Sequence, residues 1–159
     1  MEKSELKSGD AAPDFKLLDQ DEKPVELKDF AGKKLLVYFY PKASTPGCTT
    51  QACSIRDAFA DLKDLGVAVI GISPDMPDAL KKFATEYSLN FTLLSDSEKK
   101  AAAAYYVLNE KSISGLISGG IIRSSFLVSE DGRVLQTWYR VKPEQTVPFA
   151  VEFVKGLSR

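Results

Sequence analysis

The chain contains two cysteines, and both lie in the segment YFYPKASTPGCTTQAC at residues 38–53. Cys48 follows an apolar run, a proline and a short loop of small residues, and Cys53 comes five residues later. A cysteine can serve as a nucleophile, a metal ligand, half of a disulfide or a small packing residue, and its surroundings decide which. The position and spacing of this pair are therefore the strongest chemical information in the sequence.

Cys48 is expected at the start of an amphipathic helix. Apolar residues recur with 4-3-4-3 spacing and form one stripe, at Cys48, Ala52, Ile55, Phe59 and Leu62. The first turn of a helix presents unpaired N–H groups and the positive end of the helix dipole. Because this environment favours a thiolate, it can lower the pKa of a cysteine from about 8.5 to between about 3.5 and 7.5. We therefore expect Cys48 to be a reactive thiol.

The spacing of the two thiols has a geometric consequence for a disulfide. On an ideal helix, residues five apart have Cα atoms roughly 8–9 Å apart. A disulfide requires Cα atoms about 4.4–6.8 Å apart. Cys48 and Cys53 therefore cannot bond while both remain helical, and a disulfide between them requires the first turn or more of the helix to unwind. Such a pair suits a redox switch better than a structural crosslink.

The overall composition restricts the function further. The 159 residues predict a single domain covering 1–159, and 44% hydrophobic with 27% charged residues is typical of a globular protein. A net charge of −1 does not favour nucleic acid or an anionic membrane surface as a partner. The lack of histidine excludes Cys-His and Ser-His-Asp hydrolases, and two thiols alone do not complete a zinc site. No apolar run approaches the roughly 20 residues of a membrane span, and the polar N-terminus lacks a secretory signal, so we expect a cytoplasmic protein.

Two continuous apolar runs, at residues 33–40 and 67–73, predict buried strands on either side of this helix. Strand, helix and strand within about 40 residues form a βαβ unit with a parallel strand pair. The pattern further downstream predicts a helix over 77–87, a strand from Phe91, a helix from near Asp96 and a hairpin over 123–140 that turns at Asp131-Gly132.

The two ends of the chain complete the expected fold. A hairpin is predicted over 14–30, and Thr146 is expected to cap a final helix that ends near Gly156. This helix should direct four side chains to the core: Phe149, Phe153, Val154 and Leu157. Trp138 is also expected in the core, and the glycines at 115–120 predict a loop because they lack the GxGxxG spacing of a dinucleotide site. Together these elements predict an α/β fold, with a central mixed sheet flanked by helices.

The residues around Cys48 resemble a known family. PKASTPGC is similar to the PxxxT-x-x-C signature of peroxiredoxins, with Pro41, Thr45 and Cys48 at its defined positions. Cys53 lies where the Q-type, or bacterioferritin-comigratory-protein, subfamily has its resolving thiol. IRSSFLV resembles a downstream strand of the family and places Arg123 at the arginine that faces the thiolate. The likeness extends over nearly the whole chain.

The resemblance implies a thioredoxin-like fold with an N-terminal β-hairpin extension, and a thiol peroxidase activity. Cys48 would attack a peroxide to give a sulfenic acid, and Cys53 would then close an intramolecular disulfide that thioredoxin or a similar dithiol reopens. Thr45, the Cys48 backbone N–H and Arg123 would stabilise the leaving oxygen, and Pro41 would shape the pocket. The resemblance implies no metal or organic cofactor. A resolving thiol in the same chain favours a monomer.

The residues taken alone also fit other interpretations. Thr45 fits an N-cap hydroxyl, Arg123 a surface charge on a strand, and Pro41 a strand terminator. Gln51 stands where many relatives have glutamate, so the electrostatics of the helix start differ from theirs. The nearest alternative function is a thioredoxin-like disulfide reductase, although that function requires CxxC. A redox-sensing binding protein stays open, whereas a metal chaperone is disfavoured because the chain lacks CxxxC and histidine.

Overall fold

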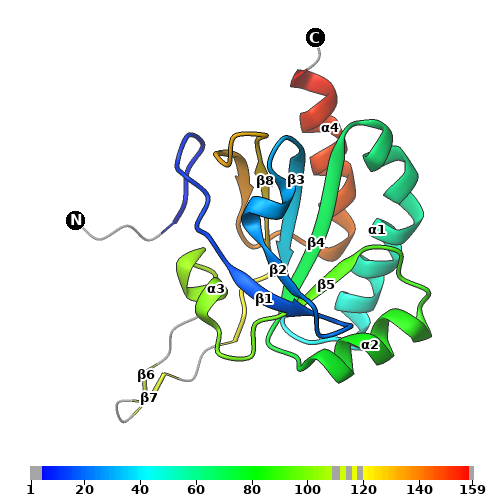
Figure 1. The fold of residues 1–159 in the computed structure, drawn as a ribbon, viewed down its shortest axis with the longest axis vertical. Coiled ribbons are helices and arrows are strands. Elements are labelled where there is room, and N and C mark those ends of the chain that lie inside the picture. Colours follow the sequence, from blue (N-terminus) through cyan, green and yellow to red (C-terminus); the bar gives the residue numbers. More distant parts are fainter. Residues whose placement is uncertain (1–4, 109–111, 114–115, 118–119, 158–159) are drawn as a thin grey trace.

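The computed structural model describes residues 5–108, 112–113, 116–117 and 120–157. Its main strands are β1 (Lys16–Asp19), β2 (Pro24–Glu26), β3 (Lys34–Phe39), β4 (Val67–Ser73), β5 (Thr92–Ser95), β8 (Ser124–Val128) and β9 (Val134–Trp138). They form a seven-stranded sheet in the order β2-β1-β5-β4-β3-β8-β9 (Figure 1). β4 pairs in parallel with β3 and β5, and the other neighbours are antiparallel, so the predicted mixed sheet is confirmed.

Helices cover both faces of this sheet. One face carries α1 (Pro46–Asp64), α2 (Pro77–Glu86) and α4 (Thr146–Leu157), and α3 (Lys100–Ala104) lies on the other (Figure 1). The predicted N-terminal hairpin is confirmed as β1 and β2. Since β1 also pairs with β5, the hairpin extends the central sheet.

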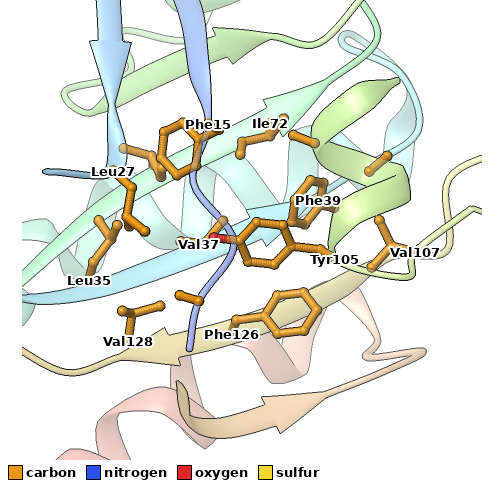
Figure 2. Close-up of a cluster of buried hydrophobic side chains, with 14 of the residues drawn as sticks. Phe15, Leu27, Leu35, Val37, Phe39, Ile72, Tyr105, Val107, Phe126 and Val128 are labelled. Atoms are coloured by element: carbon orange, nitrogen blue, oxygen red, sulfur yellow. The ribbon is translucent and has the colours of Figure 1, made fainter. Parts of the chain in front are cut away.

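Strand β3 divides its side chains between the two faces with the period of two that a strand requires. Leu35, Val37 and Phe39 belong to the core under α3, which Figure 2 shows. Leu36 and Tyr38 belong to the core under α1, α2 and α4. Because both faces are covered, β3 is a continuous apolar run, as buried strands of α/β proteins are.

Tyr38 fits beneath α1 because its partner across the parallel β3–β4 pair is Gly71. A Cβ atom built on Gly71 would lie 2.7 Å from the Tyr38 ring, closer than any real contact. The glycine therefore leaves room for the phenol ring on the face that carries α1. The Tyr38 ring therefore packs beneath the first turns of that helix.

The structure corrects two of the predicted element starts. α3 begins at Lys100 and not near Asp96, because the Asp96 carboxylate lies ahead of the helix and accepts the N–H groups of Ala101 and Ala102, at 3.1 and 2.8 Å. Thr146 is not a helix cap. Its backbone is already helical and follows the short 3-10 helix η2 (Pro143–Gln145).

Two further expectations need correction, and a third, for Trp138, is confirmed. Phe149 and Leu157 are not core residues, since 38% and 48% of their surfaces are exposed. The buried stripe of α4 runs through Thr146, Ala150 and Val154, whereas Phe149 lies to one side of it and Leu157 is in the last turn. Trp138 packs against the core under α1, α2 and α4 as expected, although it is half-buried, and its ring lies edge-on to that of Phe153 with centroids 6.0 Å apart. The predicted loop at 115–120 lies partly outside the described residues, and its residues Leu116–Ile117 form a short strand, β7, paired with β6 (Ser112–Ile113).

Candidate active site

Cys48 is the third residue of α1 and lies directly after the loop that leaves β3. Thr45 is extended, and Pro46 occupies the first helical position, where its missing N–H costs nothing and its fixed φ suits a helix. The Cys48 side chain points into the core beneath α1 and is 1% exposed. The sequence therefore starts this helix so that its first turn holds a buried thiol.

Sheet pairing brings Arg123 to this thiol from 75 residues away in the sequence. β8 is antiparallel to β3 and pairs Ser124 with Phe39, so the start of β8 adjoins the end of β3. Arg123, one residue before β8, has its carbonyl held by the Val141 N–H at 3.0 Å. Its Nη2 donates to the Cys48 Sγ at 3.4 Å. A positive charge at this distance favours the thiolate over the thiol.

Gly47 permits this close approach. A Cβ atom at Gly47 would lie 3.1 Å from the Arg123 Nη2, so a larger residue would push the guanidinium away. Glycine is a poor helix former, by roughly 1 kcal/mol relative to alanine in a helix interior. Its presence in the first turn of α1 is explained by the space that Arg123 occupies.

Gln51 joins Arg123 to the C-terminal helix. It is fully buried, one turn after Cys48 on α1. Its Oε1 accepts from the Arg123 Nη1 at 3.1 Å, and its Nε2 donates to the Thr146 Oγ1 of α4 at 2.8 Å. The result is a continuous series of side-chain hydrogen bonds from α4 to the Cys48 sulfur.

The loop that carries Thr45 and Pro41 is fixed by Asp75. The Asp75 carboxylate accepts the Ala43 N–H at 2.7 Å and the Ser73 hydroxyl at 2.8 Å. The Thr45 hydroxyl does not cap α1 but donates to the Lys42 carbonyl at 2.7 Å. Thr45 is half-buried, and Pro41 is exposed at the end of β3.

Two tyrosines of the β3 segment lie on the face that carries α1. Tyr38 and Tyr40 are stacked with ring centroids 5.4 Å apart, and both are buried. Burial raises the pKa of each phenol well above its usual value of 10, so both stay neutral at neutral pH. The Tyr38 hydroxyl lies within electrostatic reach of Cys48, Arg123 and Cys53 and has no hydrogen-bond partner among the described residues. On the side that faces β3, the thiol is therefore flanked by neutral, largely apolar groups.

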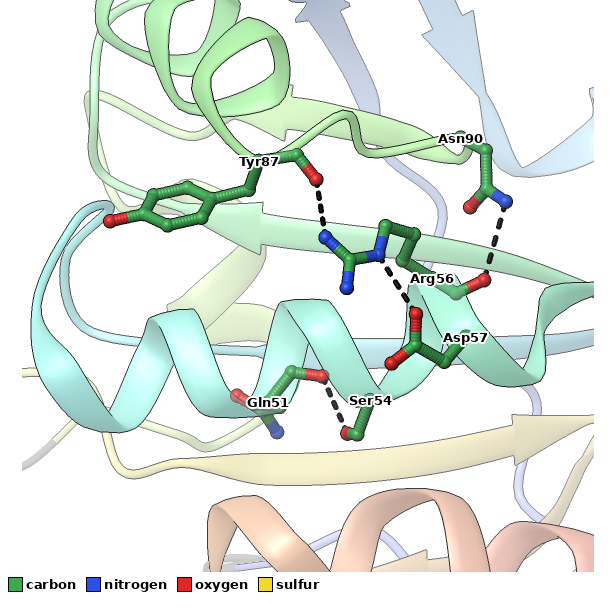
Figure 3. A network of polar contacts seen from close by, with 6 residues as sticks. All are labelled: Gln51, Ser54, Arg56, Asp57, Tyr87 and Asn90. Atoms are coloured by element: carbon green, nitrogen blue, oxygen red, sulfur yellow. Dashed lines mark hydrogen bonds and ion pairs between the residues drawn. The ribbon is translucent and has the colours of Figure 1, made fainter.

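Cys53 lies further along α1 and is half-buried, and both cysteines are free thiols. Arg56, one turn later, donates from Nη1 to the Tyr87 carbonyl at 2.7 Å and from Nε to the Asp57 carboxylate at 2.9 Å (Figure 3). The Asn90 side chain in turn donates to the Arg56 carbonyl at 3.3 Å. These contacts fasten the middle of α1 to the segment between α2 and β5.

Comparison with known proteins identifies the family. The model of the AhpC/TSA family matches residues 8–137. The chain is 47% identical over 152 residues to a putative peroxiredoxin Bcp of Haemophilus influenzae, covering 96% of this chain and 98% of that one. It is 53% identical over 129 residues to the peroxiredoxin Bcp of Escherichia coli, covering 81% and 83%. The chain belongs to the AhpC/TSA family and is a peroxiredoxin of the Bcp, or Q, type.

Solved structures agree with this assignment. A structure of the bacterioferritin comigratory protein of Xanthomonas campestris, described for its alkyl peroxide reduction activity, superposes with a TM-score of 0.84 at 30% identity. The match covers 91% of this chain and 92% of that one. The thioredoxin-like fold expected of a peroxiredoxin is thus confirmed, as is a peroxidase activity for this chain. In the part of the chain that the structure describes, no helix is long and apolar enough to cross a membrane.

Sequence reasoning missed part of this peroxiredoxin site. It singled out Cys48, Cys53, Thr45, Arg123 and Pro41. It did not predict the contacts that three other residues make with this site: Gly47, Gln51 and Thr146. Two of these had a signal in the sequence. A glycine in the first turn of a helix invites an explanation, and Gln51 lies three residues after Cys48, on the same helix face.

Proposed function

We propose that this peroxiredoxin reduces hydrogen peroxide and organic hydroperoxides through a Cys48 sulfenic acid and an intramolecular Cys48–Cys53 disulfide. The contact between the Arg123 guanidinium and the Cys48 sulfur at 3.4 Å carries the proposal, because it joins a nucleophile to a fixed positive charge. The alkyl peroxide reduction described for the similar Xanthomonas campestris protein supports the substrate class.

In the first step the Cys48 thiolate attacks one oxygen of the peroxide. The S–O bond forms as the O–O bond breaks, and the departing oxygen takes a proton to leave as water or an alcohol. Arg123 stabilises the charge that develops on this oxygen, and the Cys48 backbone N–H assists. Because the Thr45 hydroxyl donates to the Lys42 carbonyl, it differs from the expected donor to the leaving oxygen. In the proposed step its oxygen instead accepts the hydroxyl hydrogen of the peroxide. In this proposal Pro41, which is exposed at the end of β3, shapes the pocket that receives the peroxide.

In the second step the Cys53 thiolate attacks the sulfur of the Cys48 sulfenic acid. The S–S bond forms as the S–O bond breaks, and the departing hydroxide takes a proton to leave as water. Both residues belong to α1, so its first turns must unwind before the sulfur atoms can meet. An external dithiol such as thioredoxin then attacks this disulfide, forms a mixed disulfide, and leaves both thiols reduced and itself oxidised.

The cycle needs no second copy of the chain, which supports a monomer as the working form. It also needs a supply of reduced dithiols, which a reducing compartment such as the cytoplasm provides.

The proposal is tested by reacting the reduced protein with one equivalent of hydrogen peroxide, quenching with an alkylating agent and weighing the products. We expect rapid loss of two thiols and a peptide in which Cys48 is bonded to Cys53. Cys48→Ser should lose peroxidase activity altogether, whereas Cys53→Ser should consume one equivalent of peroxide and then stall with thioredoxin as reductant. Residual turnover in Cys48→Ser, or two thiols that stay free for minutes in the unmodified protein, would exclude the mechanism.

A further inference from the structure

The series of hydrogen bonds from α4 to Cys48 carries an inference about Thr146. We propose that Thr146 is a positioning residue for the peroxidase reaction: acting through the Gln51 amide, it holds the Arg123 guanidinium against the Cys48 sulfur. The inference rests on the proposed role of Arg123 beside the Cys48 thiolate. It makes the C-terminal helix, beyond the residues matched by the family model, part of the thiolate site.

The chemistry of the partners fixes which atom of Gln51 faces which neighbour. A guanidinium can only donate, so the atom facing the Arg123 Nη1 at 3.1 Å must be the amide oxygen. The NH₂ group then faces Thr146, whose hydroxyl oxygen accepts at 2.8 Å. The Thr146 hydroxyl in turn reaches the Lys142 carbonyl at 3.5 Å, which is available for its own proton. Each end of the amide therefore sets the orientation of the other.

Burial makes this orientation strict. Gln51 is 0% exposed and Thr146 is 1% exposed, so water cannot replace either partner without rearrangement. If the Thr146 hydroxyl were removed, the Gln51 NH₂ group would be left buried without its acceptor, which is costly. The amide would then turn or shift to find another, and its oxygen would move away from Arg123. A change on α4 thus reaches the thiol through two side chains.

Gln51 is also neutral, at a position where many relatives have glutamate. A carboxylate at this site would pair with Arg123 and offset the positive charge that favours the thiolate. Among the described residues, no carboxylate lies within ion-pair distance of Arg123. An amide holds the guanidinium in place and leaves its charge to act on Cys48.

Other ionisable groups around Cys48 leave Arg123 as the main source of charge. From β3 the site is faced by Tyr38 and Tyr40, which burial keeps neutral. On the side of η2, the residue next to Gly47 is Pro143, which is uncharged. Its two sequence neighbours, Lys142 and Glu144, are exposed. Cys53 is the other thiol on the same helix, and the Asp75 carboxylate is bound to the Ala43 N–H and the Ser73 hydroxyl.

A purely structural role is the competing explanation, in which the bond between Gln51 and Thr146 only fastens α4 to α1. The two explanations differ in what Thr146→Val does to the reactivity of Cys48. Thr146→Ser is the matched variant, because it keeps the hydroxyl and loses only a methyl group. Gln51→Glu keeps the side-chain shape and the ability to accept from Arg123 but adds a negative charge.

The test measures alkylation of Cys48 by iodoacetamide across a range of pH, together with the rate of its first reaction with hydrogen peroxide. Mass spectrometry separates Cys48 from Cys53, and unfolding in urea reports stability. For Thr146→Val we expect a peroxide rate about five- to tenfold lower, as for loss of one buried hydrogen bond, and alkylation shifted to higher pH. Thr146→Ser should stay within about twofold of the unmodified rate, and Gln51→Glu should shift alkylation to higher pH in a folded protein.

Two results would overturn the inference. In the first, Thr146→Val is destabilised while its peroxide rate and alkylation profile match those of the unmodified protein. In the second, which is informative even if Thr146→Val does not fold, Gln51→Glu leaves the alkylation profile unchanged. Alkylation needs no peroxide, so a failure of the proposed peroxide mechanism would appear separately, as an unmodified protein whose Cys48 is alkylated normally but does not react with peroxide.

Discussion

The two parts of helix α1 are built differently. The first part, Pro46–Cys53, buries the side chains that carry the chemistry: the Cys48 thiol and the Gln51 amide. The second part, 54–64, buries Ile55 and Leu62 completely. Apolar side chains of this size contribute about 1.5–3 kcal/mol each when fully buried, whereas a thiol or a paired amide contributes less.

The two parts also differ in what fastens them. The first part is held through Gln51 to Arg123 and Thr146, by side-chain hydrogen bonds that can break and re-form. The second part is held by Arg56, which bonds to the Tyr87 carbonyl and receives a bond from Asn90 at its own carbonyl (Figure 3). We infer from this difference that the first part is the segment that unwinds when the proposed disulfide forms, and that the second part stays helical.

The largest effect on stability is expected from Ile55→Ala in the second part. Ile55 is fully buried between α1 and the sheet, so truncation should lower the free energy of unfolding by about 2–5 kcal/mol. Urea unfolding measures this change. Leu157→Ala is the matched control, an apolar truncation at a residue that is 48% exposed, and should cost well under half as much. Equal losses in the two variants would show that the second part of α1 is not the anchored one.

Gly47→Ala should separate stability from reactivity in the first part. Alanine favours the helix by up to about 1 kcal/mol, so the free energy of unfolding should stay level or rise. Its Cβ would lie 3.1 Å from the Arg123 Nη2 and displace the guanidinium by a few tenths of an ångström, so the peroxide rate should fall severalfold.

The matched control for this variant is Gly156→Ala on α4. A Cβ atom there meets nothing within 4 Å, so the helix gains the same propensity with no contact to the site. Urea unfolding and the first reaction with peroxide are measured for both variants. A peroxide rate that is unchanged in Gly47→Ala would mean that the approach of Arg123 to Cys48 does not control reactivity.

A smaller loss of stability than in Ile55→Ala is expected from Arg56→Met, which keeps the aliphatic stem and removes the donors. Loss of the bond to the Tyr87 carbonyl should lower the free energy of unfolding by about 1 kcal/mol. Arg140→Met, which removes an exposed ion pair to Glu5 at 3.5 Å, should change it by less than about 0.5 kcal/mol. Urea unfolding compares the two, and a larger loss in Arg140→Met would contradict the anchoring role of Arg56.

Much of this architecture is predictable from local patterns. The apolar runs of β3 and β4 and the stripe of α1 depend on neighbours in the sequence, and their helix and strand assignments are confirmed. The prediction for α4 was less accurate, because four apolar residues were assigned to the core and Phe149 and Leu157 are exposed. Spacing along one helix does not specify how far the opposing surface extends.

The candidate site was predictable only in part for the same reason. Cys48, Thr45 and Pro41 lie within one short segment, so a sequence signature captures them together. The contact between Gln51 and Thr146 joins residues 95 apart and depends on how α4 packs on α1. Thr146 was interpreted as a helix cap, because its place at the start of the final helix gave no sign of this contact.

Amide hydrogen exchange along α1, in the reduced protein and after one equivalent of hydrogen peroxide, tests the division of this helix most directly. Once mass spectrometry has verified the Cys48–Cys53 disulfide, we expect the amides of residues 50–53 to lose protection and those of 59–64 to keep it. Full protection of residues 50–53 in the disulfide form would contradict the account, as would loss of protection along the whole helix.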